Sequence, residues 1–483
     1  MVDYYENSGL EGSSNASIAD MVMRSALTPD GGKLVIAMVG LPARGKSFIA
    51  HKLHRFLSWS GHKTEIFNAG QNRRKTSVAM GIPTGDGLKS TSRSNFFDSS
   101  NPDAASKRET IAMETLDTLL DWLDEGGDIA IFDATNSTLA RRSLVTQRCL
   151  ERSSVALSIG CVFVETICDD PEVLAANLLI KVRASPDFKG MSEEEALADL
   201  RDRIHHYEQV YETISDTEGA YIKIYNLSRK VTANQVFGRM SKSILPYMMA
   251  IHIGDRSIYL LALPVDSGEL HYGFTKDKAP SPGSNTPSGS ANSSPKTPKS
   301  STGSLEYTER IVQWAVKTVA VKGRLRVLSS TRLLAVEAAS ALAAAGPGIK
   351  MTHESSLNPL DRGTRVGYLD DDDHEMEFDQ RFEGGGESYA DLVRRLEPCL
   401  LDIEGSVDPV LVISHVGPCR ALRAYFLGYD VAKTMLKPSS EGALSLANRT
   451  QSAVELHPKV GGGWEERIHN LKAIVTTPNT CMP

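Results

Sequence analysis

The sequence predicts an α/β protein of two domains, the first of which binds phosphate at the edge of a mostly parallel sheet. Short apolar runs alternate with helical patterns in both halves of the 483 residues. A glycine-rich phosphate-loop pattern directly follows the first apolar run. Between the halves, 22 of the 26 residues from Ala279 to Ser304 are Ser, Thr, Pro, Gly or Asn.

The first domain is expected at residues 31–246, after a disordered tail at residues 1–30. Its first strand is the continuous apolar run Leu34–Val39, which is typical of a strand buried on both faces. Further strands are expected at Thr64–Asn68, Ile129–Phe132, Ala156–Glu165 and Tyr221–Tyr225, and helices at Ala112–Leu123, Pro171–Val182 and Glu193–Ile214. This alternation implies a mostly parallel sheet that is covered on both faces.

A second α/β domain is expected at residues 247–278 and 305–475, interrupted by an insert at residues 279–304. The insert has too few apolar residues to offset its chain entropy, so we expect it to be disordered. Its four Ser-Pro or Thr-Pro steps make protein kinases candidate partners, with a plain linker as the alternative. Elements of this domain are expected at Leu325–Leu328, Leu333–Ala345, Ser388–Ile403 and Pro409–Ser414.

Composition argues against several classes of function. A net charge of −7 does not suit a nucleic-acid binder held by bulk charge. The six cysteines show no CxxC pair, as expected of reduced thiols in a cytoplasmic protein. The apolar runs are shorter than the ~20 residues that a membrane helix needs, so we expect no membrane partner.

The segment Gly40–Ser47 matches the phosphate-loop pattern GxxxxGK[ST] between a strand and a helix. Its backbone N–H groups are expected to close around phosphate oxygens, while Lys46 reaches the outer phosphates and Ser47 binds magnesium. The alternative is a glycine-rich turn with an incidental lysine. We therefore expect ATP and Mg²⁺ as cofactors, with nucleotide contacts from Gly40, Ala43, Arg44, Gly45, Lys46 and Ser47.

A second strand ends at Asp133, which places a carboxylate at the carboxyl edge of the sheet, where ligands collect. Asp133 is expected to hold magnesium or to accept a proton from an attacking hydroxyl, and a helix-capping role is the alternative. Arginines expected in or near loops at this edge suggest a grip on a second anionic substrate, although each alone is typical of a solvated surface. They are Arg73, Arg74, Arg108, Arg141, Arg142 and Arg203.

The chain resembles the 6-phosphofructo-2-kinase/fructose-2,6-bisphosphatase family. The resemblance rests on the motifs GLPARGKS, FNAGQNRRK, FDATNSTLARR, VFVETICDDP and ASPDF, and it covers about Lys33 to Arg256. It implies a kinase domain of the nucleoside-monophosphate-kinase-like class. Such a domain transfers phosphate from ATP to the 2-hydroxyl of fructose 6-phosphate and so controls glycolysis and gluconeogenesis.

The resemblance also assigns residues. Lys46, Asp133 and Lys181 fall at catalytic positions, although some members place the last lysine where this chain has Val182. The sugar-phosphate site falls on Arg73, Arg74, Arg108, Ser137, Arg141, Arg203 and Tyr207. The segment Ala79–Ala105 is longer than in the family, which leaves a different small-molecule substrate open. Family members are often dimers, so a homodimer is expected.

The second half resembles the family's bisphosphatase, which has a phosphoglycerate-mutase-like fold and a phosphohistidine mechanism. That mechanism needs an RHGE motif after the first strand, but Leu263 occupies the place of the nucleophile and offers no lone pair. The second phosphate-binding arginine and the acid of the family align with Leu334 and Pro359. His415 and Arg420 remain, either as vestigial residues or as an anion pocket.

The resulting expectation is a 6-phosphofructo-2-kinase with a degenerate, inactive bisphosphatase domain. Three alternatives stay open at this point: a bifunctional kinase and bisphosphatase, a P-loop kinase for another small molecule, and a regulator that binds nucleotide without catalysis.

Overall fold

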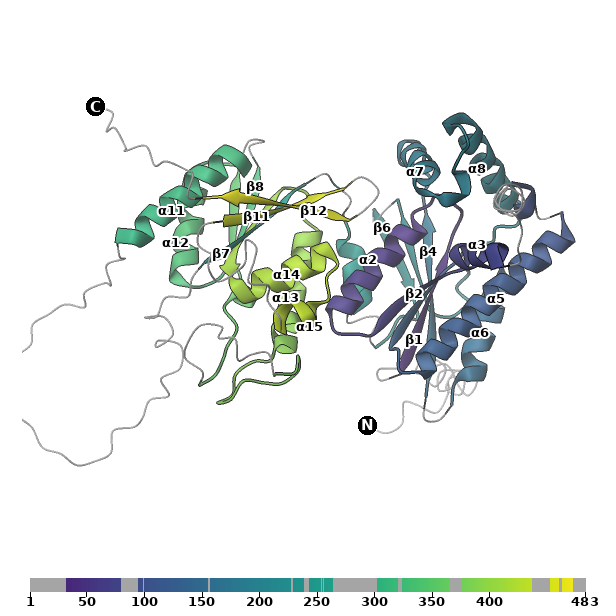
Figure 1. The fold of residues 1–483 in the computed structure, drawn as a ribbon, viewed down its shortest axis with the longest axis horizontal. Helices are drawn as coiled ribbons and strands as arrows, with labels where there is room; N and C mark the ends of the chain where they lie inside the picture. The colour runs from purple at the N-terminus through teal and green to yellow at the C-terminus, as the bar shows by residue number, and fades with distance from the viewer. Residues whose placement is uncertain are drawn as a thin grey trace, which may run out of the picture. The chain divides into compact units, whose positions relative to one another are not determined.

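The computed structural model describes two α/β units that divide between Ile253 and Gly254 (Figure 1). The described residues are 32–79, 94–98, 100–154, 157–226, 229–238, 243–252, 254, 256–263, 302–319, 324–364, 376–436, 452–459 and 463–471. The predicted tail at 1–30 and positions 279–301 of the predicted insert lie outside them. No helix among the described residues is long and apolar enough to cross a membrane.

The first unit is built on a six-stranded sheet in the order β2-β3-β1-β4-β5-β6. Its strands are β1 (Lys33–Val39), β2 (Thr64–Asn68), β3 (Ile129–Asp133), β4 (Ile159–Ile167), β5 (Tyr221–Tyr225) and β6 (Lys230–Asn234). All neighbouring pairs are parallel except β5 and β6, which confirms the predicted mostly parallel sheet. Strand β1 is central because it pairs with β3 on one side and β4 on the other, and its apolar run is buried.

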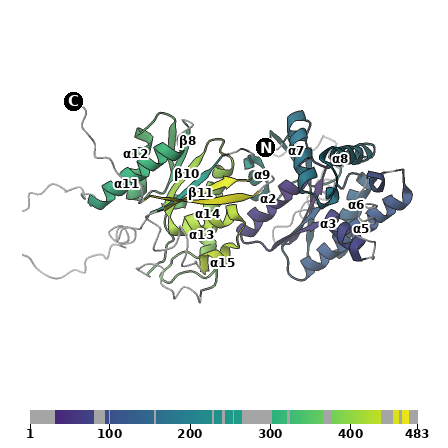
Figure 2. The same cartoon turned by 45° about the horizontal axis from the view of Figure 1, so that its top comes forward.

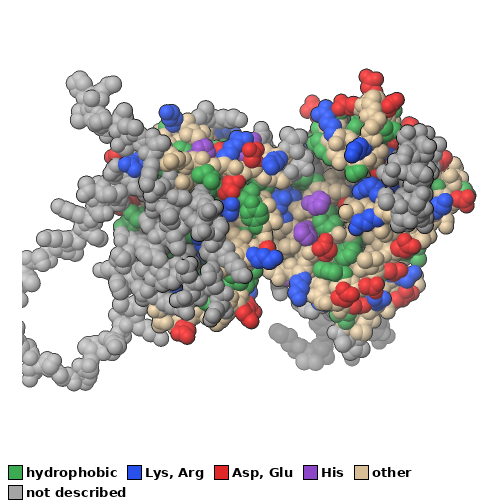
Figure 3. All heavy atoms as spheres, in the orientation of Figure 1, with side chains coloured by type: hydrophobic (Ala, Val, Ile, Leu, Met, Phe, Trp, Pro, Cys, Tyr) green, Lys and Arg blue, Asp and Glu red, His purple; other side chains and the backbone are tan. Residues whose placement is uncertain are grey.

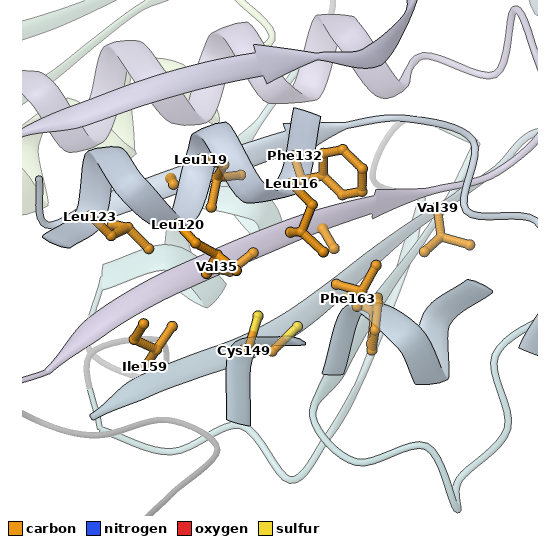
Figure 4. Close-up of a cluster of buried hydrophobic side chains, with 14 of the residues drawn as sticks. Val35, Val39, Leu116, Leu119, Leu120, Leu123, Phe132, Cys149, Ile159 and Phe163 are labelled. Atoms are coloured by element: carbon orange, nitrogen blue, oxygen red, sulfur yellow. The ribbon is translucent and has the colours of Figure 1, made fainter. Parts of the chain in front are cut away.

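The helices of the first unit cover both faces of this sheet (Figure 2). They are α2 (Lys46–Trp59), α3 (Ala69–Ala79), η1 (Ser94–Phe97), α5 (Pro102–Asp124), α6 (Leu139–Arg152), α7 (Pro171–Ala184), η2 (Pro186–Phe188), α8 (Glu193–Glu208) and α9 (Leu245–Ala250). Figure 4 shows leucines of α5 pointing toward Val35 of β1 and Phe163 of β4. That apolar layer packs α5 against the sheet, and it includes Phe132 of β3, the strand that ends at Asp133.

Three predicted elements of this unit have ends that differ by three or more residues from the structure. The helix predicted at Ala112–Leu123 begins at Pro102, where the Asn101 side chain caps it by accepting from the Ala104 N–H. The helix predicted to reach Ile214 stops at Glu208, because the chain beyond it bonds to Glu165 at the end of β4. The Tyr211 hydroxyl and the Ile214 N–H both donate to that carboxylate. The strand predicted to begin at Ala156 begins at Ile159.

The second unit has a sheet in the order β12-β11-β7-β10-β8-β9. Its strands are β7 (Ile258–Leu263), β8 (Leu325–Ser329), β9 (Ile349–His353), β10 (Val410–His415), β11 (Ser452–Pro458) and β12 (Trp464–Asn470). Its helices are α11 (Thr302–Trp314), the π-helix η4 (Ala315–Val319), α12 (Leu333–Ala344), η6 (Ser355–Leu357), α13 (Tyr389–Glu404), α14 (Val416–Leu427) and α15 (Val431–Leu436). The four strands β7, β10, β8 and β9 are parallel, and β11 and β12 add an antiparallel edge.

Candidate active site

The loop between β1 and α2 has the backbone that a phosphate cradle requires. Gly40 has φ +140°, and a Cβ atom there would lie 2.7 Å from the Thr166 carbonyl oxygen, so a larger residue does not fit. Gly45 has φ +88° immediately before α2 begins at Lys46. The two glycines therefore let this loop close at the amino end of a helix, where backbone N–H groups favour anions.

Lys46 lies folded over this loop. It is 8% exposed, and its Nζ donates a hydrogen bond to the Leu41 carbonyl oxygen at 2.7 Å. Burial lowers the pKa of Lys46 to about 7, although the Asp133 carboxylate opposes this shift. Since a nearby anion favours the charged form, a phosphate bound in the loop is expected to restore the proton.

A proton should therefore be taken up when ATP binds. At about pH 8 we expect close to one proton per ATP, because Lys46 is mostly neutral before binding and charged after it. Calorimetric titration in two buffers with different ionisation enthalpies measures this number. Lys46→Met should bind ATP without this uptake, and equal binding heats in both buffers for the wild-type chain would contradict the assignment.

Asp133 lies at the end of β3, one strand from the loop. It is buried, and its Oδ2 accepts hydrogen bonds from Ser47 Oγ at 2.8 Å and Asn68 Nδ2 at 2.5 Å. A hydroxyl beside a carboxylate at the start of the loop's helix is the oxygen pair that suits Mg²⁺ bound to nucleotide phosphates. The helix-capping alternative is wrong, because Thr138 caps α6.

Arg73, Arg74 and Arg203 converge on one carboxylate. Arg73 Nη2 and Arg203 Nη1 donate to Asp187 Oδ2 at 2.6 and 3.2 Å, and Arg74 Nη1 donates to Oδ1 at 3.4 Å. The sequence suggested a loop for Arg73 and Arg74, but both lie in the helix α3. Figure 3 shows basic side chains gathered on the first unit where α3, α7 and α8 meet.

Lys181 joins this cluster from α7. The residue is exposed, yet crowding of its ammonium by protein atoms lowers its pKa, against the attraction of Asp133 and Asp187. Val182, the alternative position for this lysine, is buried in an apolar cluster with Phe188. Lys181 therefore offers an ammonium group that both carboxylates attract, whereas Val182 offers no charge.

Arg108 and Tyr207 meet a pair of phenylalanines that the sequence analysis missed. Arg108 Nη1 donates to the Phe96 carbonyl oxygen, and the Tyr207 ring lies 5.9 Å from the Phe97 ring. Burial lowers the pKa of Arg108. Both phenylalanines belong to the long segment 79–105, and an aromatic pair within that otherwise polar stretch was the signal that they are buried.

The adjacent arginines of α6 point to different partners. Arg141 Nε donates to both oxygens of Glu109 at 2.7 and 2.9 Å, in a half-buried pair. Arg142 is 1% exposed and bonds to Glu218. Arg141 therefore remains a candidate for substrate, whereas Arg142 is structural, contrary to its grouping with the anion-binding arginines.

The remaining predicted contacts lie at the rim of the loop. Ala43 has φ +59°, and Arg44 Nη2 lies 3.7 Å from Glu208 at the end of α8. Ser137 is buried, and its carbonyl oxygen accepts from the Glu212 N–H at 2.8 Å. This contact connects the Asp133 turn to the segment that follows α8.

In the second unit, Leu263 and His415 are paired at the ends of β7 and β10. Strand β7 continues through Leu263, whose side chain is buried. His415 Nε2 lies 3.0 Å from Ser330 Oγ, and burial lowers the pKa of His415 to about 3, an effect to which repulsion by Arg332 adds. The histidine is therefore neutral at physiological pH.

The other positions that the sequence analysis singled out lie on neighbouring elements of the second unit. Arg420 is buried in α14, which begins directly after His415. Leu334 packs against the apolar core on α12. The Pro359 carbonyl oxygen accepts from Arg395 Nη2 at 2.9 Å, so its backbone holds an arginine where the family has an acidic side chain.

The first unit is thus a mostly parallel α/β domain with a glycine-rich loop and a basic cluster, and a family model described as 6-phosphofructo-2-kinase matches residues 23–255. A model described as histidine phosphatase superfamily, branch 1, matches residues 311–457. The chain belongs to the 6-phosphofructo-2-kinase/fructose-2,6-bisphosphatase family.

Relatives under that name align with most of this chain. The enzyme of Caenorhabditis elegans is 33% identical over 82% of this chain and 81% of its own length. Isoform 3 of Rattus norvegicus is 32% identical over 81% of this chain and 66% of its own length. The 6-phosphofructo-2-kinase 1 of Saccharomyces cerevisiae is 34% identical over 83% of this chain, which spans 48% of that relative.

Proposed function

We propose that this chain phosphorylates the 2-hydroxyl of fructose 6-phosphate with ATP and Mg²⁺, and that it does not hydrolyse the product, fructose 2,6-bisphosphate. The main observation that supports kinase activity is the arrangement of Lys46, Ser47 and Asp133 at the sheet edge, where Lys46 bonds to the loop and Ser47 bonds to Asp133. The basic cluster around Asp187 supplies a second anion site within the same unit. Family membership supports the same activity.

Phosphoryl transfer depends mainly on positioning and on neutralising charge. The loop and Lys46 would hold the outer phosphates of ATP, and Arg44 is placed at the rim. Ser47 and Asp133 would hold Mg²⁺, which when bound offsets the charge on the phosphates. Lys181, which faces both Asp133 and Asp187, is placed to stabilise the transferred group between donor and acceptor.

Asp133 fits a metal-holding role better than a proton-accepting one. Its Oδ2 already accepts from Ser47, in the helix that follows the phosphate loop, and from Asn68, at the end of the neighbouring strand β2. A general base must reach the hydroxyl that it deprotonates. Because the loose transition state of phosphoryl transfer needs little help from a base, orientation of the acceptor by the arginines would suffice.

The second unit has lost the group that starts phosphatase chemistry. Leu263 lies beside His415 at the sheet edge, and an alkyl side chain cannot attack phosphorus. His415 is neutral, is buried and contacts Ser330. The yeast relative carries a name that includes only the kinase.

A coupled assay with ATP and fructose 6-phosphate tests the kinase and separates the alternatives. Turnover with this sugar supports the proposal, and turnover only with another small molecule would identify a different P-loop kinase. Binding of both ligands without turnover would point to a non-catalytic regulator. Wild-type protein purified in full length is the form to use.

Labelled fructose 2,6-bisphosphate tests the loss of the phosphatase. We expect no phosphate release above that of a buffer blank, because the nucleophile's place is taken by Leu263. A bifunctional relative serves as the positive control. Phosphate release that disappears in His415→Ala would show instead that the second unit is an active phosphatase of a different design.

A further inference from the structure

We propose that Asp187 is a positioning residue for the phosphate of the acceptor: it holds the guanidinium groups of Arg73 and Arg203 in the arrangement that binds fructose 6-phosphate. This inference rests on the proposed kinase function and adds a residue to it. Asp187 itself is not expected to touch the substrate, since a carboxylate repels a phosphate.

The geometry joins three separate elements through one carboxylate. Arg73 comes from α3, Arg203 from α8 and Asp187 from η2. Asp187 Oδ2 accepts from Arg73 Nη2 at 2.6 Å and from Arg203 Nη1 at 3.2 Å. All three side chains are 7–8% exposed, so solvent screens these charges little. Charge-assisted hydrogen bonds of this kind fix orientation as well as distance.

The two guanidinium groups also lie against the same aromatic ring. Arg73 Cζ is 5.1 Å and Arg203 Cζ is 4.8 Å from the Phe97 centroid. The ring attracts each cation but cannot offset the repulsion between them. Burial opposes ionisation of Asp187, yet the arginines overcome this and hold the pKa of that carboxyl below its usual value. The carboxylate therefore makes it possible for both cations to remain buried side by side.

The cluster carries more positive than negative charge. Arg74 and Lys181 interact with the same carboxylate, and Arg203 Nε also donates to Asp199 Oδ2 at 2.7 Å. Apart from Asp133, which attracts Lys181 from the proposed metal site, four cations thus face two carboxylates, Asp187 and Asp199, among the described residues. A dianionic phosphate ester balances that excess, which is why the cluster suits a sugar phosphate and not a neutral sugar.

The test compares Asp187→Asn with Glu193→Gln in the full-length kinase. Asp187→Asn should raise the KM for fructose 6-phosphate about tenfold or more, because the arginines lose their shared anchor. Its KM for ATP should change less than about twofold, because the phosphate loop is untouched. Glu193→Gln removes a carboxylate at the start of α8 that makes an exposed pair with Arg183 at 2.9 Å, so its effect on either KM should stay below about twofold.

The outcomes separate this inference from the proposed function. Turnover by the wild-type chain with equal KM values in the two variants overturns the role of Asp187 and leaves the kinase intact. A fall in kcat with both KM values unchanged indicates a merely structural residue and also overturns it. Absence of wild-type turnover overturns the proposed function and this inference together.

A second variant keeps the test decisive if Asp187→Asn does not fold. Asp187→Glu keeps the charge but moves the carboxylate by one methylene group, so the arginines lose their alignment and not their counter-ion. We expect a rise of about threefold or more in the KM for fructose 6-phosphate alone. An unchanged KM in Asp187→Glu would overturn the inference.

Discussion

Lys46→Met is expected to reduce kcat at least ~10²-fold, because it removes the cation that the phosphate loop places beside the transferred group. The variant should remain folded. Lys46 is 8% exposed, and burial lowers its pKa to about 7. Folding therefore disfavours the charged form of this side chain relative to the unfolded chain. Methionine fills similar space without that cost.

The lowered pKa of Lys46 makes the stability of the folded chain depend on pH. The unfolded chain binds a proton at Lys46 up to about pH 10, whereas the folded chain releases it above about pH 7. Stability of the wild-type chain therefore rises with pH across that window through this residue. Lys46→Met should lack this contribution, which melting temperatures at pH 7 and pH 9 will show.

Lys63→Met is the matched control for the activity. Lys63 is exposed and precedes β2, at the end of the sheet opposite the phosphate loop. Its substitution should leave kcat within about twofold of the wild type. Near-normal turnover of Lys46→Met in the same assay would mean that the phosphate-binding site lies elsewhere in the chain.

The local parts of the site were predictable from the sequence because their geometry is set within a few residues. The spacing of Gly40, Gly45 and Lys46 predicts a loop at a helix start, and the structure has that loop. The position of Asp133 at a strand end follows from one apolar run. Parallel strands then bring both features to the same edge of the sheet.

The partners of the arginines were not predictable, because they are distant in sequence. Arg73 and Asp187 are 114 residues apart, and Arg142 and Glu218 are 76 apart. Arg141 and Arg142 look alike in the sequence, but one faces half-exposed Glu109 and the other is fully buried. Only the packing of α6 decides which of two neighbours is structural.

Two of the three strands missed in the second unit, β9 and β12, lack the pattern that reveals a strand, whereas in the buried strand β11 the charged Glu455 interrupts the apolar residues. In β9 four of the five residues are exposed, and β12 mixes charged and half-buried residues. Edge strands are half-solvated, so their sequences carry no apolar run. The central strand β10 is buried throughout, and it was predicted with its end one residue short.

Arg142→Met is expected to destabilise the first unit by about 3–5 kcal/mol, because it leaves the buried Glu218 carboxylate without its counter-ion. Arg142 Nε and Nη2 donate to Glu218 at 2.5 and 3.0 Å, and the two side chains are 1% and 7% exposed. Arg142 Nη1 also donates to the Glu212 carbonyl oxygen at 2.8 Å. Methionine has no N–H group, so these acceptors would lose their hydrogen bonds.

Urea unfolding of the full chain by circular dichroism measures this loss, and the transition that ATP moves to higher urea identifies the first unit. Arg148→Met on the same helix is the control, since its pair with Asp117 at 3.5 Å is exposed and should contribute no more than about 1 kcal/mol.

The Glu218 carboxyl is buried, which opposes its ionisation, yet Arg142 and Ser215 hold its pKa below the usual value. The contribution of Glu218 is therefore present above about pH 5 and is lost as the pH falls through its folded pKa. The difference in the free energy of unfolding between Arg142→Met and the wild type should therefore become smaller in acid. A difference that becomes larger in acid would contradict the pairing of Arg142 with Glu218.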